Sequence, residues 1–306
     1  MERLVIPVLT PAAADVIADL AARPGLEVVA VAIDVGSGTG LDALRDVALV
    51  AGARRCHVVD RLEPLAAAVL WPALRAGALG VPGPPVLTAL SMPAVAETVA
   101  EICRHEQATS GAVWADDPRD RQRLRALLKA VAPTLGLVAV TSAAPLAATA
   151  NAWARVEPAG DGEAPAPRPV AAGVAEIRIG FERGHPVSLN DVAMTPGELI
   201  DSLATITRAH GAGTWTVRGD GGAWTVHAPA ALALHLACEA MTAPLFDAPT
   251  SAMAATVAEA YAAVVRDGQW FSPVRAGLDA FVDRVLDPAT GDVRLRVVNG
   301  RIEVDA

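Results

Sequence analysis

A glycine-rich segment, Asp-Val-Gly-Ser-Gly-Thr-Gly, begins at Asp34 directly after the apolar run 27–33. Small residues of this kind let backbone N–H groups approach a ligand closely. In open parallel sheets, ligands bind at the carboxyl ends of the strands, where this segment would lie. Its glycine spacing is not that of a dinucleotide-binding fingerprint. Two interpretations stay open: a ligand site at Asp34, Gly36, Ser37 and Gly38, or a plain turn between a strand and a helix.

Histidine and cysteine could bind a metal or act in catalysis, but here they are scattered along the chain. No pair has a metal-ligand spacing such as His-x-x-x-His or Cys-x-x-Cys. We therefore predict no metal site and no catalytic residues, and we expect reduced cysteines, as in the cytoplasm. The residues are His57, His105, His185, His210, His227, His235, Cys56, Cys103 and Cys238.

The composition is that of a globular protein with a large apolar core. Of the 306 residues, 53% are hydrophobic, which is enough for one large domain or two smaller ones. The formal net charge is −9 and no run of lysine and arginine occurs, so we expect no nucleic-acid partner. Residues 1–9 are too short an apolar stretch for a secretory signal or a membrane span. We expect a cytoplasmic protein that does not contact a membrane.

Short apolar runs alternate with amphipathic stretches over residues 1–142, which predicts a parallel sheet flanked by helices. Thr10 is a possible helix N-cap with Pro11 at the first helical position, and Asp116 or Asp117 could cap a later helix. The predicted strands are residues 4–9, 27–33, 55–59, 111–115 and 135–140, and the predicted helices are 12–22, 41–51, 62–76, 94–105 and 121–131.

Proline, alanine and glycine dominate residues 143–173, which we interpret as an exposed linker. Residues 174–306 mix hairpins with helices, so an α+β domain is predicted. Thr195, Pro196 and Glu198 indicate a capped helix start, as do Ser272 and Pro273. The predicted hairpins are 176–181 with 187–189, 215–217 with 224–227, and 293–298 with 301–304 around Asn299-Gly300, and the predicted helices are 195–210, 230–241, 251–266 and 273–285.

Several motifs, in order along the chain, resemble the argininosuccinate synthase family. Phe181-Glu182-Arg183-Gly184-x-Pro-Val-x-Leu-Asn is similar to the start of that family's synthetase domain. The segment Asp-Gly-Gln-Trp-Phe-Ser-Pro-x-Arg from Asp267 resembles the family's Asn-Gly-Leu-Trp-Phe-Ser-Pro-Leu-Arg. In the first half, the stretch around Asp34 resembles the family's Ala-Asp-Val-Gly, and Pro-Ala-Leu-Arg-Ala from Pro72 matches a family helix.

This resemblance implies an adenine-nucleotide alpha-hydrolase-like α/β domain followed by an α+β synthetase-like domain. It also implies an ATP-dependent ligation of citrulline to aspartate, with magnesium. Three local features serve that reaction in the family, and each can be compared with this sequence.

The first feature is the phosphate loop, Ser-Gly-Gly-Leu-Asp-Thr-Ser in the family. Glycine N–H groups, hydroxyls and a helix N-terminus hold the pyrophosphate there. Residues 9–15 here read Leu-Thr-Pro-Ala-Ala-Ala-Asp and contain no glycine. Pro11 lacks a backbone donor, and Asp15 would put a negative charge beside the phosphates. We predict a plain helix start and no ATP binding.

The other two features also differ from the family. Its Gly-Cys-Thr-Gly-Lys-Gly segment is replaced by Trp-Ala-Asp-Asp-Pro-Arg from Trp114, where Arg119, Arg121 and Arg123 leave open either an anion site or a solvated face. In the family a tyrosine near Tyr-Glu-Thr-Pro faces citrulline, and the position aligned with it here is Val226, which has no hydroxyl.

These losses predict a shortened, non-catalytic homologue that needs neither ATP nor magnesium and serves as a module for an unknown protein or small-molecule partner. Two alternatives remain: an enzyme repurposed for a specialised amino-acid-related pathway, and a residual citrulline–aspartate ligase. The family continues past its last strand into a helical arm that contacts neighbouring subunits, whereas this chain stops at Ala306. We therefore expect a monomer or homodimer and not the family's tetramer.

Overall fold

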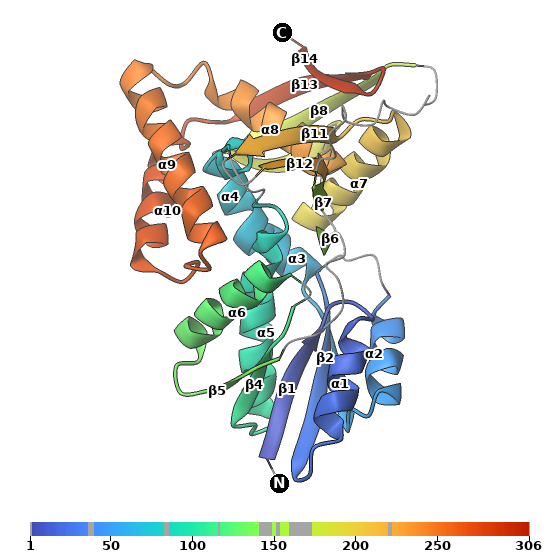
Figure 1. Ribbon diagram of the computed structural model, residues 1–306. Helices are drawn as coiled ribbons and strands as arrows, with labels where there is room; N and C mark the ends of the chain where they lie inside the picture. Colours follow the sequence, from blue (N-terminus) through green and yellow to red (C-terminus); the bar gives the residue numbers. More distant parts are fainter. Residues whose placement is uncertain are drawn as a thin grey trace. The chain divides into compact units, whose positions relative to one another are not determined.

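The computed structural model describes residues 2–35, 40–82, 86–115, 117–140, 149–150, 154–158, 173–219 and 222–305. They form two compact units, each assembled from more than one stretch of the chain (Figure 1). Unit 1 comprises Met1–Leu65, Ala89–Ala152 and Val265–Phe271, and unit 2 comprises Ala66–Thr88, Trp153–Val264 and Ser272–Ala306. Among the described residues, no helix combines the length and the apolar character that crossing a membrane would need.

Unit 1 contains a five-stranded sheet in the order β3-β2-β1-β4-β5, with every described pair parallel, as predicted. Its middle is apolar on both faces, since residues 28–33 of β2 are all buried. Such strands need helices on both sides. The strands are β1 Glu2–Val8, β2 Leu26–Asp34, β3 Arg55–Asp60, β4 Ser110–Val113 and β5 Gly136–Ala139.

Two pairs of helices cover the sheet of unit 1 (Figure 1). Helices α1 and α2 pack together, and their apolar residues, such as Ile17 and Leu44, join the core formed with Leu4 and Ile6 of β1. Helices α5 and α6 pack together, and α5 contacts β1, β2 and β4. The helices are α1 Ala13–Ala21, α2 Leu41–Val50, α5 Met92–His105 and α6 Pro118–Val131, with the short turns α3 Leu62–Leu65 and η3 Ala89–Ser91.

The helix predicted over residues 62–76 is present, with a π-helical turn inside it. Helix α3 continues directly into the π-helical turn η1 Ala66–Leu70 and then into α4 Trp71–Arg75, and η2 Ala78–Gly80 follows. Pro72 explains the wider turn, because it has no N–H to donate and its ring crowds the carbonyl of the preceding turn. The predicted helix is confirmed, but the π-helical turn was not predicted.

Unit 2 contains an antiparallel sheet in the order β10-β9-β8-β13-β14. Side chains along its strands point alternately to the two faces. In β8, Ile177 and Ile179 are buried, while Glu176, next to Ile177, is exposed. A second antiparallel ladder joins β11 to β12 and β12 to β7. The strands are β7 Arg155–Pro158, β8 Ala175–Glu182, β9 His185–Leu189, β10 Val192–Ala193, β11 Thr214–Gly219, β12 Gly222–His227, β13 Gly291–Val298 and β14 Arg301–Asp305. The helices are α7 Pro196–Ala209, α8 Pro229–Thr242, α9 Ala248–Arg266 and α10 Pro273–Val285. The short strand β6 Thr149–Ala150 falls within the residues of unit 1.

Most local predictions in the second half are confirmed. Thr195 and Glu198 form a reciprocal capping box at the start of α7, and the Ser272 side chain caps α10. The turn between β13 and β14 has positive φ at both Asn299 and Gly300, 51° and 77°, as a type I′ turn requires. The three predicted hairpins are present.

In two stretches, the units differ from the predicted domains, residues 1–142 and residues 174–306. Ala66–Thr88 belongs to unit 2, where α4 packs against α8. Val265–Phe271 belongs to unit 1, where the Arg123 guanidinium binds the Arg266 carbonyl. Most of the predicted linker, residues 143–173, lies outside the described residues. Its strand β7 nevertheless pairs with β12, and Pro158 is tolerated as the last residue of that strand.

Candidate functional site

The carboxyl edge of the sheet in unit 1 is where a doubly wound fold binds a ligand. The strand order reverses beside β1, which lies between β2 and β4. The residues that follow β1, β2, β3 and β4 meet along this edge, so the candidate site is built from these four connections.

The loop after β1 leads into α1 by a backbone turn. The N–H of Ala13 donates to the Thr10 carbonyl at 3.3 Å, and the N–H of Ala14 donates to the Pro11 carbonyl at 3.1 Å. Helix α1 begins at Ala13, and its N-cap is Ala12, which makes no side-chain cap. The prediction of Thr10 as N-cap is therefore wrong, because Pro11 favours a turn in which Thr10 serves through its carbonyl.

Four ligand residues were predicted at the end of β2 and in the connection that follows it, and only Asp34 is among the described residues. Asp34 is half-buried at the end of β2, and its carbonyl accepts the N–H of Arg61 at 3.0 Å. Gly36, Ser37 and Gly38 lie outside the described residues. Asp34 is thus placed at the carboxyl edge, beside the end of β3, as the sequence pattern predicted.

Arg61, which follows β3 directly, is a charged residue of this edge that the sequence analysis did not single out. Its Nε donates to the hydroxyl of Thr98 on α5 at 2.9 Å, and its other guanidinium nitrogen forms an ion pair with Glu101. Thr98 is fully buried. The guanidinium is therefore fixed on α5, and its place directly after a strand was the only signal of it in the sequence.

The segment after β4 holds the arginines for which an anion site was considered. Asp117 caps α6 by accepting the N–H of Arg119 at 2.7 Å, which confirms one of the two predicted caps; Asp116 lies outside the described residues. The Arg119 side chain returns to the Asp117 carboxylate at 3.0 Å. Arg121 donates to the Ala115 carbonyl at 2.9 Å and lies over the Trp114 ring at 6.0 Å.

Arg123 is buried and points elsewhere. It pairs with Asp120 at 2.5 Å and donates to the Arg266 carbonyl at 2.8 Å. The three arginines after β4 are thus each engaged by the protein itself. Burial opposes ionisation of Asp117, but the hydrogen bonds and charge of Arg119 lower the pKa of its carboxyl overall.

The position in unit 2 at which the resemblance predicts a valine in place of a family tyrosine is part of the core. Val226 on β12 is fully buried and pairs with Val156 of β7. Its neighbour His227 shares a hydrogen bond of 3.0 Å between Nδ1 and the Thr214 hydroxyl. This strand therefore offers packing and a histidine–threonine contact, without a phenol.

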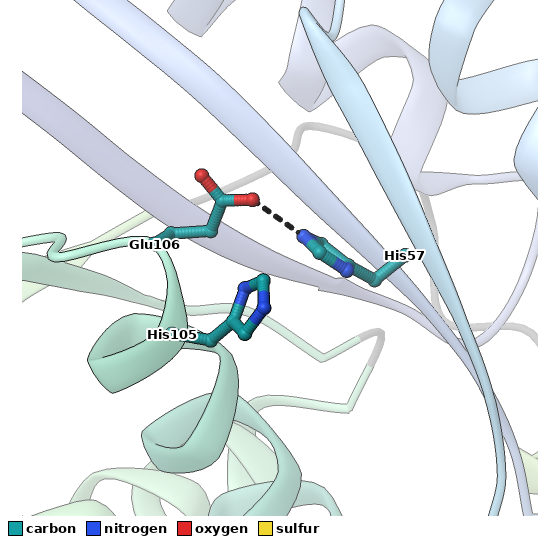
Figure 2. A group of neighbouring side chains, drawn as sticks. All are labelled: His57, His105 and Glu106. Atoms are coloured by element: carbon teal, nitrogen blue, oxygen red, sulfur yellow. Dashed lines mark hydrogen bonds and ion pairs between the residues drawn. The ribbon is translucent and has the colours of Figure 1, made fainter.

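A second polar cluster lies at the opposite, amino-terminal edge of the sheet, where α5 ends. Figure 2 shows the imidazoles of His57 on β3 and His105 on α5 turned toward the carboxylate of Glu106. His57 Nε2 is 2.7 Å from Glu106 Oε1, and the two rings are 5.5 Å apart, edge to face. The spacing in the sequence did not reveal this cluster, because His57 and His105 are brought together only by packing of α5 on the sheet.

Comparisons with known proteins match both halves of the chain. Residues 12–152 match the family model described as the arginosuccinate synthase N-terminal HUP domain, and residues 165–306 match the model of the arginosuccinate synthase C-terminal domain. The chain is 28% identical to the argininosuccinate synthase of Moorella thermoacetica over 320 residues, covering 90% of this chain and 78% of that protein. It is 30% identical to the argininosuccinate synthase of Rubrobacter xylanophilus over 319 residues, with coverage of 90% and 78%. The chain belongs to the argininosuccinate synthase family.

Proposed function

We propose that this chain is a non-catalytic member of its family, which keeps the two-part scaffold as a module for binding a small molecule or a protein partner. On this proposal it does not ligate citrulline to aspartate and requires neither ATP nor magnesium. The observation that carries the proposal is the loop between β1 and α1.

ATP does not fit the donors of this loop. A phosphate cradle needs free backbone N–H groups that converge at a helix N-terminus. Here Pro11 has no N–H, and the N–H groups of Ala13 and Ala14 already bind the carbonyls of Thr10 and Pro11. Asp15 in the first turn of α1 opposes an anion at that helix end.

The segment after β4 supports the same proposal independently. Phosphoryl chemistry uses cationic side chains that are aimed at the transferred group. In this chain, Arg119 is paired with Asp117, and Arg121 with the Ala115 carbonyl. Recruiting either guanidinium to a ligand would first break an internal contact.

A binding role remains open to the connection after β2. Asp34 is half-buried at the carboxyl edge, beside the point where the strand order reverses. Together with Gly36, Ser37 and Gly38 it is the ligand contact that we propose. A carboxylate there favours a ligand with a cationic or hydroxyl group over a phosphate.

Calorimetry with magnesium–ATP tests the loop, and an assay for argininosuccinate from citrulline, aspartate and ATP tests the reaction. We expect no heat of binding and no product. A second protein, with residues 9–15 replaced by Ser-Gly-Gly-Leu-Asp-Thr-Ser, should still form no product, because the changes after β4 and at Val226 are separate. Micromolar ATP affinity in the natural chain, or product from either protein, would overturn the proposal.

The binding role is tested by thermal denaturation in the presence of individual nucleotides and amino acids. A ligand that binds only the folded chain raises the thermal midpoint. At a ligand concentration one hundred times its Kd, the free energy of unfolding increases by about 2.7 kcal/mol. We expect a shift with an amino acid or amine and none with ATP, and the Asp34→Ala variant should lose the shift. A shift that survives Asp34→Ala would place the ligand elsewhere.

A further inference from the structure

The cluster of His57, His105 and Glu106 has the donor atoms of a transition-metal site. Each residue offers one ligand atom, and these atoms all lie within 4.8 Å of one another. Two imidazole nitrogens and one carboxylate oxygen are a set that zinc binds, commonly with water as the fourth ligand. The edge of the sheet at which they lie is opposite the candidate ligand edge, so this cluster is separate from the function proposed above.

The position of Glu106 is fixed by the end of α5. Its N–H closes the last helical turn on the Ile102 carbonyl at 2.8 Å. The next residue, Gln107, has a left-handed φ of 52°, which ends the helix and turns the chain away. Glu106 is only 4% exposed, so its carboxylate is held in one place beside β3.

Two arginines orient the carboxylate. Arg3 and Arg55 approach Glu106 Oε2 at 3.5 and 3.3 Å, and Arg55 also donates to Oε1 at 3.4 Å. The same Oε1 faces His57 Nε2 at 2.7 Å. Outer contacts of this kind hold a metal-binding carboxylate in place. Both arginines also pair with Glu27, at 3.2 and 3.3 Å. The two guanidinium charges are therefore balanced by two carboxylates, and the cluster has no net charge when both imidazoles are neutral.

The geometry requires two small adjustments: His57 and Glu106, now 2.7 Å apart, separate slightly, and His105 moves toward them. Ligand atoms about 2.0–2.1 Å from a tetrahedral zinc ion are about 3.4 Å from one another. His57 and Glu106 already meet, and the side chain of His105 is exposed and can turn toward them. In Figure 2 both rings border the space in front of the Glu106 carboxylate.

We propose that His57, His105 and Glu106 bind one divalent transition-metal ion of the zinc class. The ion replaces the hydrogen bond between His57 and Glu106 with two metal–ligand bonds, and His105 supplies the third. It thereby links β3 to the carboxyl end of α5. A hydrogen-bonded ion pair without a metal is the competing explanation, and the experiment separates the two.

The test is calorimetric titration of the chelator-treated full chain with zinc chloride, with cobalt(II) absorption as a second readout. We expect one ion per chain and a cobalt spectrum without a thiolate charge-transfer band. The His105→Ala variant should lower the affinity at least about tenfold. Because His105 is exposed, its removal should leave the zinc-free thermal midpoint within about 1–2 °C of the natural chain.

Two control variants guard against binding elsewhere. His210→Ala removes another histidine at the end of a helix, α7, and Cys56→Ala removes the thiol next to His57 on β3. Both should bind zinc as the natural chain does. The proposal is overturned if the natural chain binds no zinc at 100-fold excess over protein, if His105→Ala binds it unchanged, or if Cys56→Ala abolishes it.

Discussion

Removing one member of the buried ion pair between Asp120 and Arg123 should destabilise unit 1. Burial raises the pKa of the Asp120 carboxyl despite the nearby Arg123, so the pair itself adds little net stability, but a single remaining charge would be costly. The two side chains are 8% and 9% exposed and meet at 2.5 Å, one helical turn apart on α6. Arg123 Nε also donates to the Arg266 carbonyl at 2.8 Å, which ties α6 to the end of α9. Removing the Asp120 carboxylate takes away the ion-pair partner of a buried guanidinium. Arginine cannot escape this by losing its proton.

We expect Asp120→Ala to lower the free energy of unfolding by about 3–5 kcal/mol, the usual loss when one member of a buried pair is removed. For a unit of this size that corresponds to a drop of about 6–20 °C in the thermal midpoint. Adding Arg123→Met should restore part of the loss. The double variant lacks both charges of this pair and leaves mainly the Arg266 carbonyl without its donor, which costs about 1–3 kcal/mol.

Helix α2 provides a matched control for this experiment. Asp42 and Arg45 have the same residue types and the same spacing of three, and they meet at 3.0 Å, but Asp42 is 85% exposed. Asp42→Ala should change stability by less than about 1 kcal/mol. Urea denaturation of the four proteins measures these differences. The reasoning fails if Asp120→Ala costs no more than Asp42→Ala, or if the double variant is less stable than Asp120→Ala alone.

Two further predictions concern the local structure that frames the two units. Asp117→Ala should lower the free energy of unfolding by about 1–2 kcal/mol at neutral pH. Because Arg119 lowers the pKa of the Asp117 carboxyl in the folded chain, the natural chain has its full advantage over the variant above about pH 4 and loses it as the pH falls further. Urea denaturation at several pH values measures this difference. Gly213→Ala should cost more than about 2 kcal/mol, since Gly213 has φ +102° and a methyl group there would collide with Pro229. Gly277→Ala, on the open side of α10, should instead stabilise the protein by about 0.5–1 kcal/mol, and equal midpoints for these two variants would contradict the argument.

Sequence periodicity was sufficient for most elements because their signals are local. The apolar run of β2 predicted a strand buried on both faces, and the capping box at Thr195 and the turn at Asn299 and Gly300 were both found as expected. The helix predicted over residues 62–76 was also found, and the π-helical turn inside it has a local cause, since Pro72 follows that turn and cannot donate an N–H.

The candidate sites depended on contacts that a single sequence does not contain. The edge position of Asp34 followed from the order of strand and turn, and the structure places it there. By contrast, Glu106 meets His57 only because α5 runs back along the sheet and ends beside β3. Nothing in the separation of these residues along the chain indicated it. Arg61 was missed for the same reason, because its partner Thr98 comes from a distant helix.

The family motifs that remain in this chain have roles in folding. Gly184 adopts φ +76° in the turn between β8 and β9, where a side chain would meet Leu286, and its N–H binds the Ala289 carbonyl at 2.7 Å. Gly268 adopts φ +67°, and a methyl group there would be 2.9 Å from the Arg123 backbone.

The same holds for the rest of the second motif, because Trp270 is 4% exposed and Ser272 caps α10. These positions would be needed by any protein with this scaffold, whether or not it performs chemistry. On the proposed function, the positions expected to differ from the family lie in the loop after β1 and in the segment after β4, whose donors would have to reach a phosphate. A chain selected only for binding would retain the residues needed for folding and be free to change those in the loop after β1 and the segment after β4. This is the pattern that the proposed function requires.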